Sequence, residues 1–113
     1  MRVAVIGGLE RHEAEIARRA GHLGHTVEFH RGRVGGRGAA ELDAIVSRSE
    51  VVIIVTKVNS HGAMHLAKRA ASRHARPAVV ARTCTPSSFP DIVGTFAPGR
   101  GAVDRGDLRV GAG

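Results

Sequence analysis

Five consecutive apolar residues, "VVIIV" from Val51 to Val55, most constrain the fold of this chain. A strand with one solvated face alternates apolar and polar residues, whereas a strand covered on both faces is apolar throughout. "RVAVI", Arg2 to Ile6, is nearly as apolar, while "HTVEFH" alternates Val27 and Phe29 with polar residues. The pattern predicts a sheet with Val51–Val55 at its centre, helices on both faces and the alternating strand at an edge.

Helical spacing of apolar residues follows each of the first three strands. We expect helices over "RHEAEIARRAGHLG", where Gly24 ends the helix, over Ala39–Arg48 and over His61–His74. "PAVVA" predicts a fourth strand, and Ser87 or Ser88 is suited to cap a short helix near Pro90–Val93.

Alternating strands and helices predict an α/β fold, with a single doubly wound parallel four-stranded sheet of the Rossmann-like or flavodoxin-like kind. Right-handed crossovers place the strands in the order 2-1-3-4. We expect one domain over residues 1–97. Pro98–Gly113 is rich in Gly and Arg and poor in apolar residues, which predicts a flexible tail.

Charge and composition narrow the partners. The chain of 113 residues has a formal net charge of +7, which favours anionic ligands, and it has no Trp and no Tyr on which bases could stack. It contains no apolar run long enough to cross a membrane, and its apolar N-terminus is too short for a secretory signal. Cys84 is the single cysteine. We therefore expect a cytoplasmic protein without a disulfide.

Doubly wound sheets bind ligands beyond the carboxyl ends of their strands, where the strand order reverses. The segments that follow the four expected strands carry polar and glycine residues suited to hold a small ligand. Asn59 or Ser60 would cap the following helix and leave the amides of His61 and Gly62 free for an anion. The expected ligand-binding residues are Gly7, Gly8, His30, Lys57, Asn59, Ser60, His61, Gly62, Arg82, Ser87 and Ser88.

Four other kinds of site compete with this hypothesis. "GGLERH" lacks the third glycine of a dinucleotide fingerprint, although Arg31 would suit a 2′-phosphate. His12, His30 and His61 form a weak alternative metal site without a carboxylate. His61, Cys84 and Lys57 are candidates for an acid/base and nucleophilic enzyme site that lacks an orienting carboxylate. Nucleic acid would bind through the third helix and the basic tail, with a steep salt dependence.

Several short motifs in this order resemble a bacterial family, the domain of unknown function 2325. They are "VIGG", "FHRG", "NSHGAMHLAKR", "RP" and "RTCTPSSF", and the resemblance covers roughly Met1–Phe89. It implies a small Rossmann-like, oligomeric domain that binds dioxygen without metal or organic cofactor. The residues that it singles out are Gly7, Gly8, His30, Ser60, His61 and Lys68, with Ser87 and Ser88. The sequence departs from the family pattern at Arg31, where an acidic residue is frequent, and at Ala71, where a cysteine is common.

The sequence therefore predicts a non-enzymatic domain that binds or senses a small ligand at the carboxyl ends of its strands. The ligand is dioxygen according to the resemblance, or a small anion according to the charge. We expect no cofactor, no membrane partner, and a homodimer or higher homo-oligomer, since the half-polar edge strand suits self-association.

Overall fold

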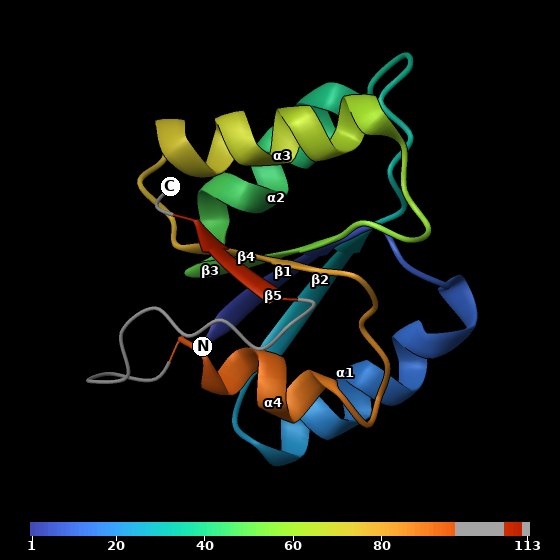
Figure 1. Ribbon diagram of the computed structural model, residues 1–113, viewed down its shortest axis with the longest axis vertical. Coiled ribbons are helices and arrows are strands. Elements are labelled where there is room, and N and C mark those ends of the chain that lie inside the picture. Colours follow the sequence, from blue (N-terminus) through green and yellow to red (C-terminus); the bar gives the residue numbers. More distant parts are fainter. Residues whose placement is uncertain (97–107, 112–113) are drawn as a thin grey trace.

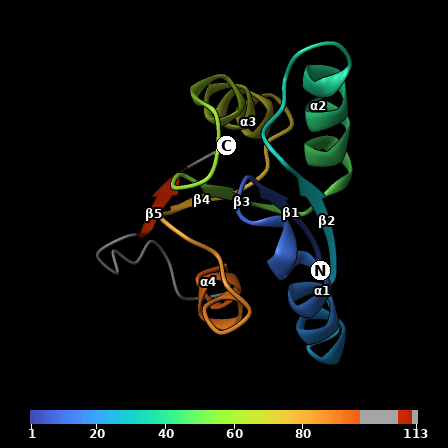
Figure 2. The same ribbon diagram turned by 90° about the vertical axis from the view of Figure 1, so that its right-hand side faces the viewer.

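A central sheet lies between two helical layers in the computed structural model, which describes residues 1–96 and 108–111 (Figures 1 and 2). One layer contains α2 (Gly38–Arg48) and α3 (His61–Arg73), and the other contains α1 (Glu13–His22) and α4 (Phe89–Gly94). A single 3-10 turn, η1 (Glu10–His12), leads into α1. None of the helices in the described residues is long and apolar enough to cross a membrane.

The sheet confirms the predicted order of the four parallel strands. These are β1 (Arg2–Ile6), β2 (Thr26–His30), β3 (Val51–Val55) and β4 (Ala78–Ala81), arranged as β2-β1-β3-β4. Ile6 of β1 is in register with both His30 and Ile54, so the carboxyl ends of three strands lie at one edge. The strand order reverses between β1 and β3, as the sequence predicts.

A fifth strand corrects one part of the prediction. Leu108–Gly111 forms β5, which pairs antiparallel with β4 and opposes Val79 with Val110. These residues belong to the stretch predicted as a flexible tail, because its Gly/Arg-rich composition has no strand periodicity. Strand pairing needs backbone groups rather than a pattern, and β4 would otherwise offer a free edge. The rest of the expected tail, 98–107 and 112–113, lies outside the described residues.

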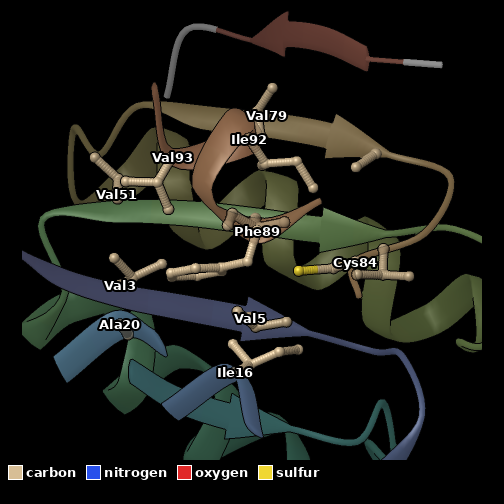
Figure 3. Packing of buried hydrophobic residues seen from close by; sticks show 13 residues of the cluster. Val3, Val5, Ile16, Ala20, Val51, Val79, Cys84, Phe89, Ile92 and Val93 are labelled. Carbon is tan, nitrogen blue, oxygen red and sulfur yellow. The ribbon is translucent and has the colours of Figure 1, made fainter. Parts of the chain in front are cut away.

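The core consists of two clusters, one on each face of the sheet. Alternate residues of β3 point to opposite faces, so that Ile53 joins the cluster under α1 and α4 while Ile54 joins the cluster under α2 and α3. Both side chains are completely buried. Phe89 of α4 lies over the sheet in the first cluster, and Cys84 lies near the carboxyl ends of the strands (Figure 3). This burial on both faces accounts for the uninterrupted apolar run of β3.

Helices α1 and α3 end in the same backbone motif but with different residues. After α1, Gly24 has φ +82° and the amide of His25 donates to the carbonyl of Ala20 over 2.8 Å. After α3, Ala75 has φ +54° and the amide of Arg76 donates to the carbonyl of Ala71 over 2.8 Å. Both are Schellman motifs, which favour glycine at the residue with positive φ.

We expect Ala75→Gly to raise the free energy of unfolding by about 0.5–1 kcal/mol, because glycine relieves the left-handed strain of alanine. Gly24→Ala is the matched control and should lower it by about 1 kcal/mol, since a Cβ there has open space and only the backbone conformation is penalised. Urea unfolding of the two variants measures both effects. A loss of stability in Ala75→Gly would contradict the assigned motif.

Candidate functional site

The Asn59 side chain ties together the strands at the switch point. Its Nδ2 donates to the carbonyl of Ile6 over 3.2 Å and to that of Val55 over 2.8 Å, the last residues of β1 and β3. Its Oδ1 accepts from the amide of Ser60 over 2.9 Å. Both amide hydrogens of Asn59 therefore bond to the protein itself. The sequence predicted that Asn59 would bind a ligand, but in the structure its amide group has no free donor.

Two glycines are required by the position of Asn59. Gly7 and Gly32 have φ +92° and +87°, where glycine is favoured over all other residues. A Cβ at Gly7 would lie 2.6 Å from Asn59 Nδ2, and a Cβ at Gly32 would lie 2.3 Å from Asn59 Oδ1. The amides of Gly7 and Gly8 donate to the carbonyls of His30 and Val58, each over 2.7 Å. The Gly-Gly turn thus serves loop packing, and its amides are already bonded.

His30 and Ser60 are also used within the fold. The His30 ring is 6% exposed; its Nδ1 lies 3.1 Å from the amide of Gly32, which donates to it, and its Nε2 lies 2.9 Å from the carbonyl of Gly38. These partners assign the ring hydrogen to Nε2. Ser60 Oγ donates to the carbonyl of Gly32 over 2.7 Å and accepts from the amide of Ala63 over 3.0 Å, so the predicted N-cap is confirmed. We call this set the polar knot: Gly7, Gly8, His30, Gly32, Asn59 and Ser60.

The remaining predicted residues lie around the knot. His61 and Gly62 open α3 and are exposed, and no hydrogen bond within residues 1–96 and 108–111 uses their amides. Arg82 is exposed, and its carbonyl accepts from the amide of Lys57 over 3.0 Å. Ser87 is exposed.

Ser88 occupies the N-cap position of α4, one of the two positions expected, but its hydroxyl makes no capping bond to the helix. Ser88 Oγ accepts from the amide of Thr85 over 2.9 Å, and Thr85 Oγ1 accepts from the amide of Ser88 over 3.1 Å. The two side chains close a reciprocal turn before the helix, as in a capping box.

A cavity of about 220 Å³ opens at the carboxyl ends of β1, β3 and β4, on the α1/α4 side of the sheet. Only Gly8 and Lys57 of the expected ligand residues line it, together with His12 and Cys84 from the alternative sites. The described residues that line it are Gly8, Leu9, His12, Val55, Lys57, Val58, Thr83, Cys84 and Thr85.

The cavity has apolar walls that the sequence analysis missed. Leu9 and Val58 line it and remain 38% and 41% exposed, among the most exposed large apolar side chains in the described part of the chain. Each follows a strand within an otherwise polar or glycine-rich segment. The sequence did contain a signal for these walls, namely apolar residues in the loops that follow strands. Such residues do not belong to the apolar face of a strand or helix, so they are candidates to line a binding site.

The fold does not bring together all three residues of the enzyme alternative, nor all three residues of the metal alternative. Burial raises the pKa of the Cys84 thiol to about 12, so it stays protonated and poorly nucleophilic at neutral pH. His61 does not line the cavity, and no described histidine bonds to Cys84. Within residues 1–96 and 108–111, no three His, Cys, Asp or Glu side chains cluster as metal ligands, so His12, His30 and His61 do not meet.

Arg31, which would suit a 2′-phosphate, forms ion pairs with two carboxylates of the protein. Its guanidinium lies 2.9 Å from a carboxylate oxygen of Glu10 and 3.4 Å from one of Glu13. Arg31 therefore links the segment after β2 to η1 and the start of α1.

Comparison with known proteins gives a family and no individual relative. No curated protein and no solved structure matches the chain. One family model matches residues 2–96, which include the polar knot and every residue that lines the cavity. The chain therefore belongs to the family described as "Uncharacterized protein conserved in bacteria (DUF2325)".

Proposed function

We propose that this protein binds a small ligand, without catalysing a reaction on it, in the cavity at the carboxyl ends of β1, β3 and β4. The observation that carries the proposal is the cavity itself, which lies beside the point where the strand order reverses. Ligands of doubly wound sheets bind at that point. The polar knot next to the cavity holds its loops in place and so keeps the binding site formed before the ligand arrives.

The walls and size of the cavity support a ligand with an apolar body. Leu9, Val55, Val58 and Cys84 contribute apolar surface. A cavity of about 150 Å³ lined by apolar side chains holds benzene in another protein. The present cavity of about 220 Å³ therefore has room for a small organic molecule, and it also admits dioxygen.

The charges at the cavity support an anionic group on that ligand. The cation Lys57 and the hydrogen-bonding ring of His12 line it, and no carboxylate of the described residues does. A bare inorganic anion would lose much of its hydration against apolar walls, which is costly. A small organic anion, with its charged group toward Lys57 and its apolar part inside, satisfies both kinds of surface. We therefore favour an organic anion over dioxygen as the ligand.

Benzoate and acetate are suitable probes for the anion, and dissolved dioxygen is a suitable probe for the gas. We expect benzoate to shift the amide resonances of Leu9, Val58 and Thr83, and to bind about tenfold more weakly to Lys57→Met, which loses one charge-assisted contact. Arg82→Met is the matched control, because Arg82 is an exposed cation outside the cavity lining. Equal weakening in both variants would show a general charge effect and contradict an anion subsite at Lys57.

Dioxygen is paramagnetic and speeds the relaxation of nearby protons. If dioxygen is the ligand, pressurising the sample with oxygen should relax the methyl groups of Val55 and Val58 selectively, and Lys57→Met should leave that effect unchanged. If neither probe perturbs the residues that line the cavity, the proposed function is wrong.

A further inference from the structure

The buried imidazole of His30 holds both ends of the loop that joins β2 to α2, residues 31–37. Its Nδ1 accepts from the amide of Gly32, at the start of the loop. Its Nε2 donates to the carbonyl of Gly38, the first residue of α2. Three residues of the loop are glycines, which give a backbone much conformational freedom. One side chain therefore fixes a loop whose own sequence favours flexibility.

The two partners of the ring determine its charge in the structure, where the loop is bonded to the ring and is here called closed. A backbone N–H can only donate and a carbonyl can only accept, so Nδ1 has a free lone pair and Nε2 carries the hydrogen. A doubly protonated His30 would direct a second N–H at the N–H of Gly32, whose nitrogen lies 3.1 Å away. Protonation keeps the bond to Gly38 and removes the bond to Gly32. The closed loop therefore requires a neutral ring.

Gly32 is also the residue through which the loop contacts the start of α3. Its carbonyl accepts from Ser60 Oγ over 2.7 Å, and Ser60 is the N-cap of α3. A Cβ at Gly62, in the first turn of the helix, would lie 3.2 Å from Cγ2 of Val34, so the loop packs directly on the helix. Figures 1 and 2 both show the loop beside this turn. A displacement of Gly32 would therefore disturb the start of α3 as well.

The charged groups around the ring permit protonation. His30 lines a hollow of about 290 Å³ at the β2 edge of the sheet, which gives protons access to a ring that is otherwise buried. Glu13 of α1 and Glu41 of α2 line the same hollow, as do Arg31 and Arg33 of the loop. Two carboxylates and two guanidinium groups offset one another, and the β1 residue in register with the ring is apolar. The main local cost of protonation is therefore the lost bond to the loop amide.

We propose that His30 is a pH-sensitive latch, whose protonation releases the Gly32 end of the loop and loosens the contact of the loop with the start of α3. An imidazole in water takes up a proton below about pH 6.5. Because the closed loop excludes the second proton and the open loop admits it, the ratio of open to closed loop should rise about tenfold for each pH unit below that value. The latch needs no ligand in the cavity, so it is independent of the proposed function.

Nitrogen NMR of the His30 ring and of the backbone amides, from about pH 7.5 to about pH 4.5, tests the latch. On acidification, the amides of Gly32, Ser60 and Ala63 should shift with the same midpoint as the ring nitrogens, while the amide of Ile53 in β3 stays unchanged. A ring that gains its second proton without a shift at Gly32 would overturn the proposal. So would a ring that stays neutral throughout, or a simultaneous change at Ile53, which would indicate global unfolding.

Two histidine variants separate the latch from other effects of acid. The side-chain oxygen of asparagine can replace Nδ1, so His30→Asn keeps an acceptor for Gly32 but cannot be protonated. In this variant the amides of Gly32 and Ala63 should lose their pH dependence. His65→Asn, which changes an exposed histidine of α3, is the matched control and should retain it. The same transition in His30→Asn, or its loss in His65→Asn, would contradict the latch. If His30→Asn does not fold, the ring titration of the unaltered protein still decides.

Discussion

Asn59→Asp is expected to lower the free energy of unfolding by about 3 kcal/mol, although the two side chains have nearly the same shape. The substitution replaces the Nδ2 donor with a charged oxygen that faces the carbonyls of Ile6 and Val55. Two carbonyls lose their partner, and a like-signed group approaches them. A domain of this size has a total stability of about 5–15 kcal/mol, so the loss would be large.

Chemical unfolding followed by circular dichroism measures this effect, and Ser87→Asp is its control. That variant introduces the same residue at an exposed position near α4 and should change stability by less than about 0.5 kcal/mol. If Asn59→Asp folded as stably as the control, the polar knot would not be structural. Asn59 would then be available to a ligand, as the sequence alone suggested.

Cys84 is expected to react with a thiol reagent such as DTNB about a thousand times more slowly in the folded protein than an accessible cysteine does at pH 8. Burial raises its pKa from 9.0 to about 12, and the thiolate fraction falls in proportion. The same shift affects stability. The unfolded chain releases the thiol proton above about pH 9 while the folded chain keeps it. The free energy of unfolding should therefore decline as pH rises from 9 toward 12, by up to about 1.4 kcal/mol per pH unit.

Cys84→Ala isolates this contribution, because it lacks the titrating group and should not show the additional decline. The comparison is made by urea unfolding of both proteins at pH 7, 9 and 10.5. Labelling of the folded protein at the rate of a free thiol would contradict the assigned burial. It would also restore Cys84 as a candidate nucleophile, so the measurement bears directly on the enzyme alternative.

The polar segment that follows β3 shows how far sequence reasoning reached. Its location at the switch point, the start of α3 and the Ser60 cap were all predictable, because they follow from chain order, helical periodicity and a local capping rule. The use of Asn59 was not predictable, since its hydrogen-bond partner Ile6 and the glycine packed against it, Gly32, are distant in the sequence. Nothing in "VNSH" indicates whether an amide will meet a ligand or the ends of two neighbouring strands.

The residues that line the cavity were also only partly predictable from the sequence, and its apolar walls were not predicted. Lys57 and Gly8, which line the cavity, were among the expected ligand residues because polar and glycine residues after strands are recognised signals. Leu9 and Val58 were not expected, because an apolar residue in a loop can be assigned to a cavity only when the fold shows which other residues lie near it. β5 was also missed, because its pairing with β4 depends on a free strand edge and not on its own composition.

The sequence by itself determined the fold class, the order of the four parallel strands and the edge of the sheet where polar groups collect. These depend on hydrophobic periodicity and the handedness of crossovers, which operate along the chain. Only the tertiary structure decided which polar groups bond to one another in the knot, which residues enclose the cavity and which carboxylates pair with Arg31. Those outcomes depend on hydrogen-bond and ion-pair partners from separate segments, which meet only after the strands have been placed side by side.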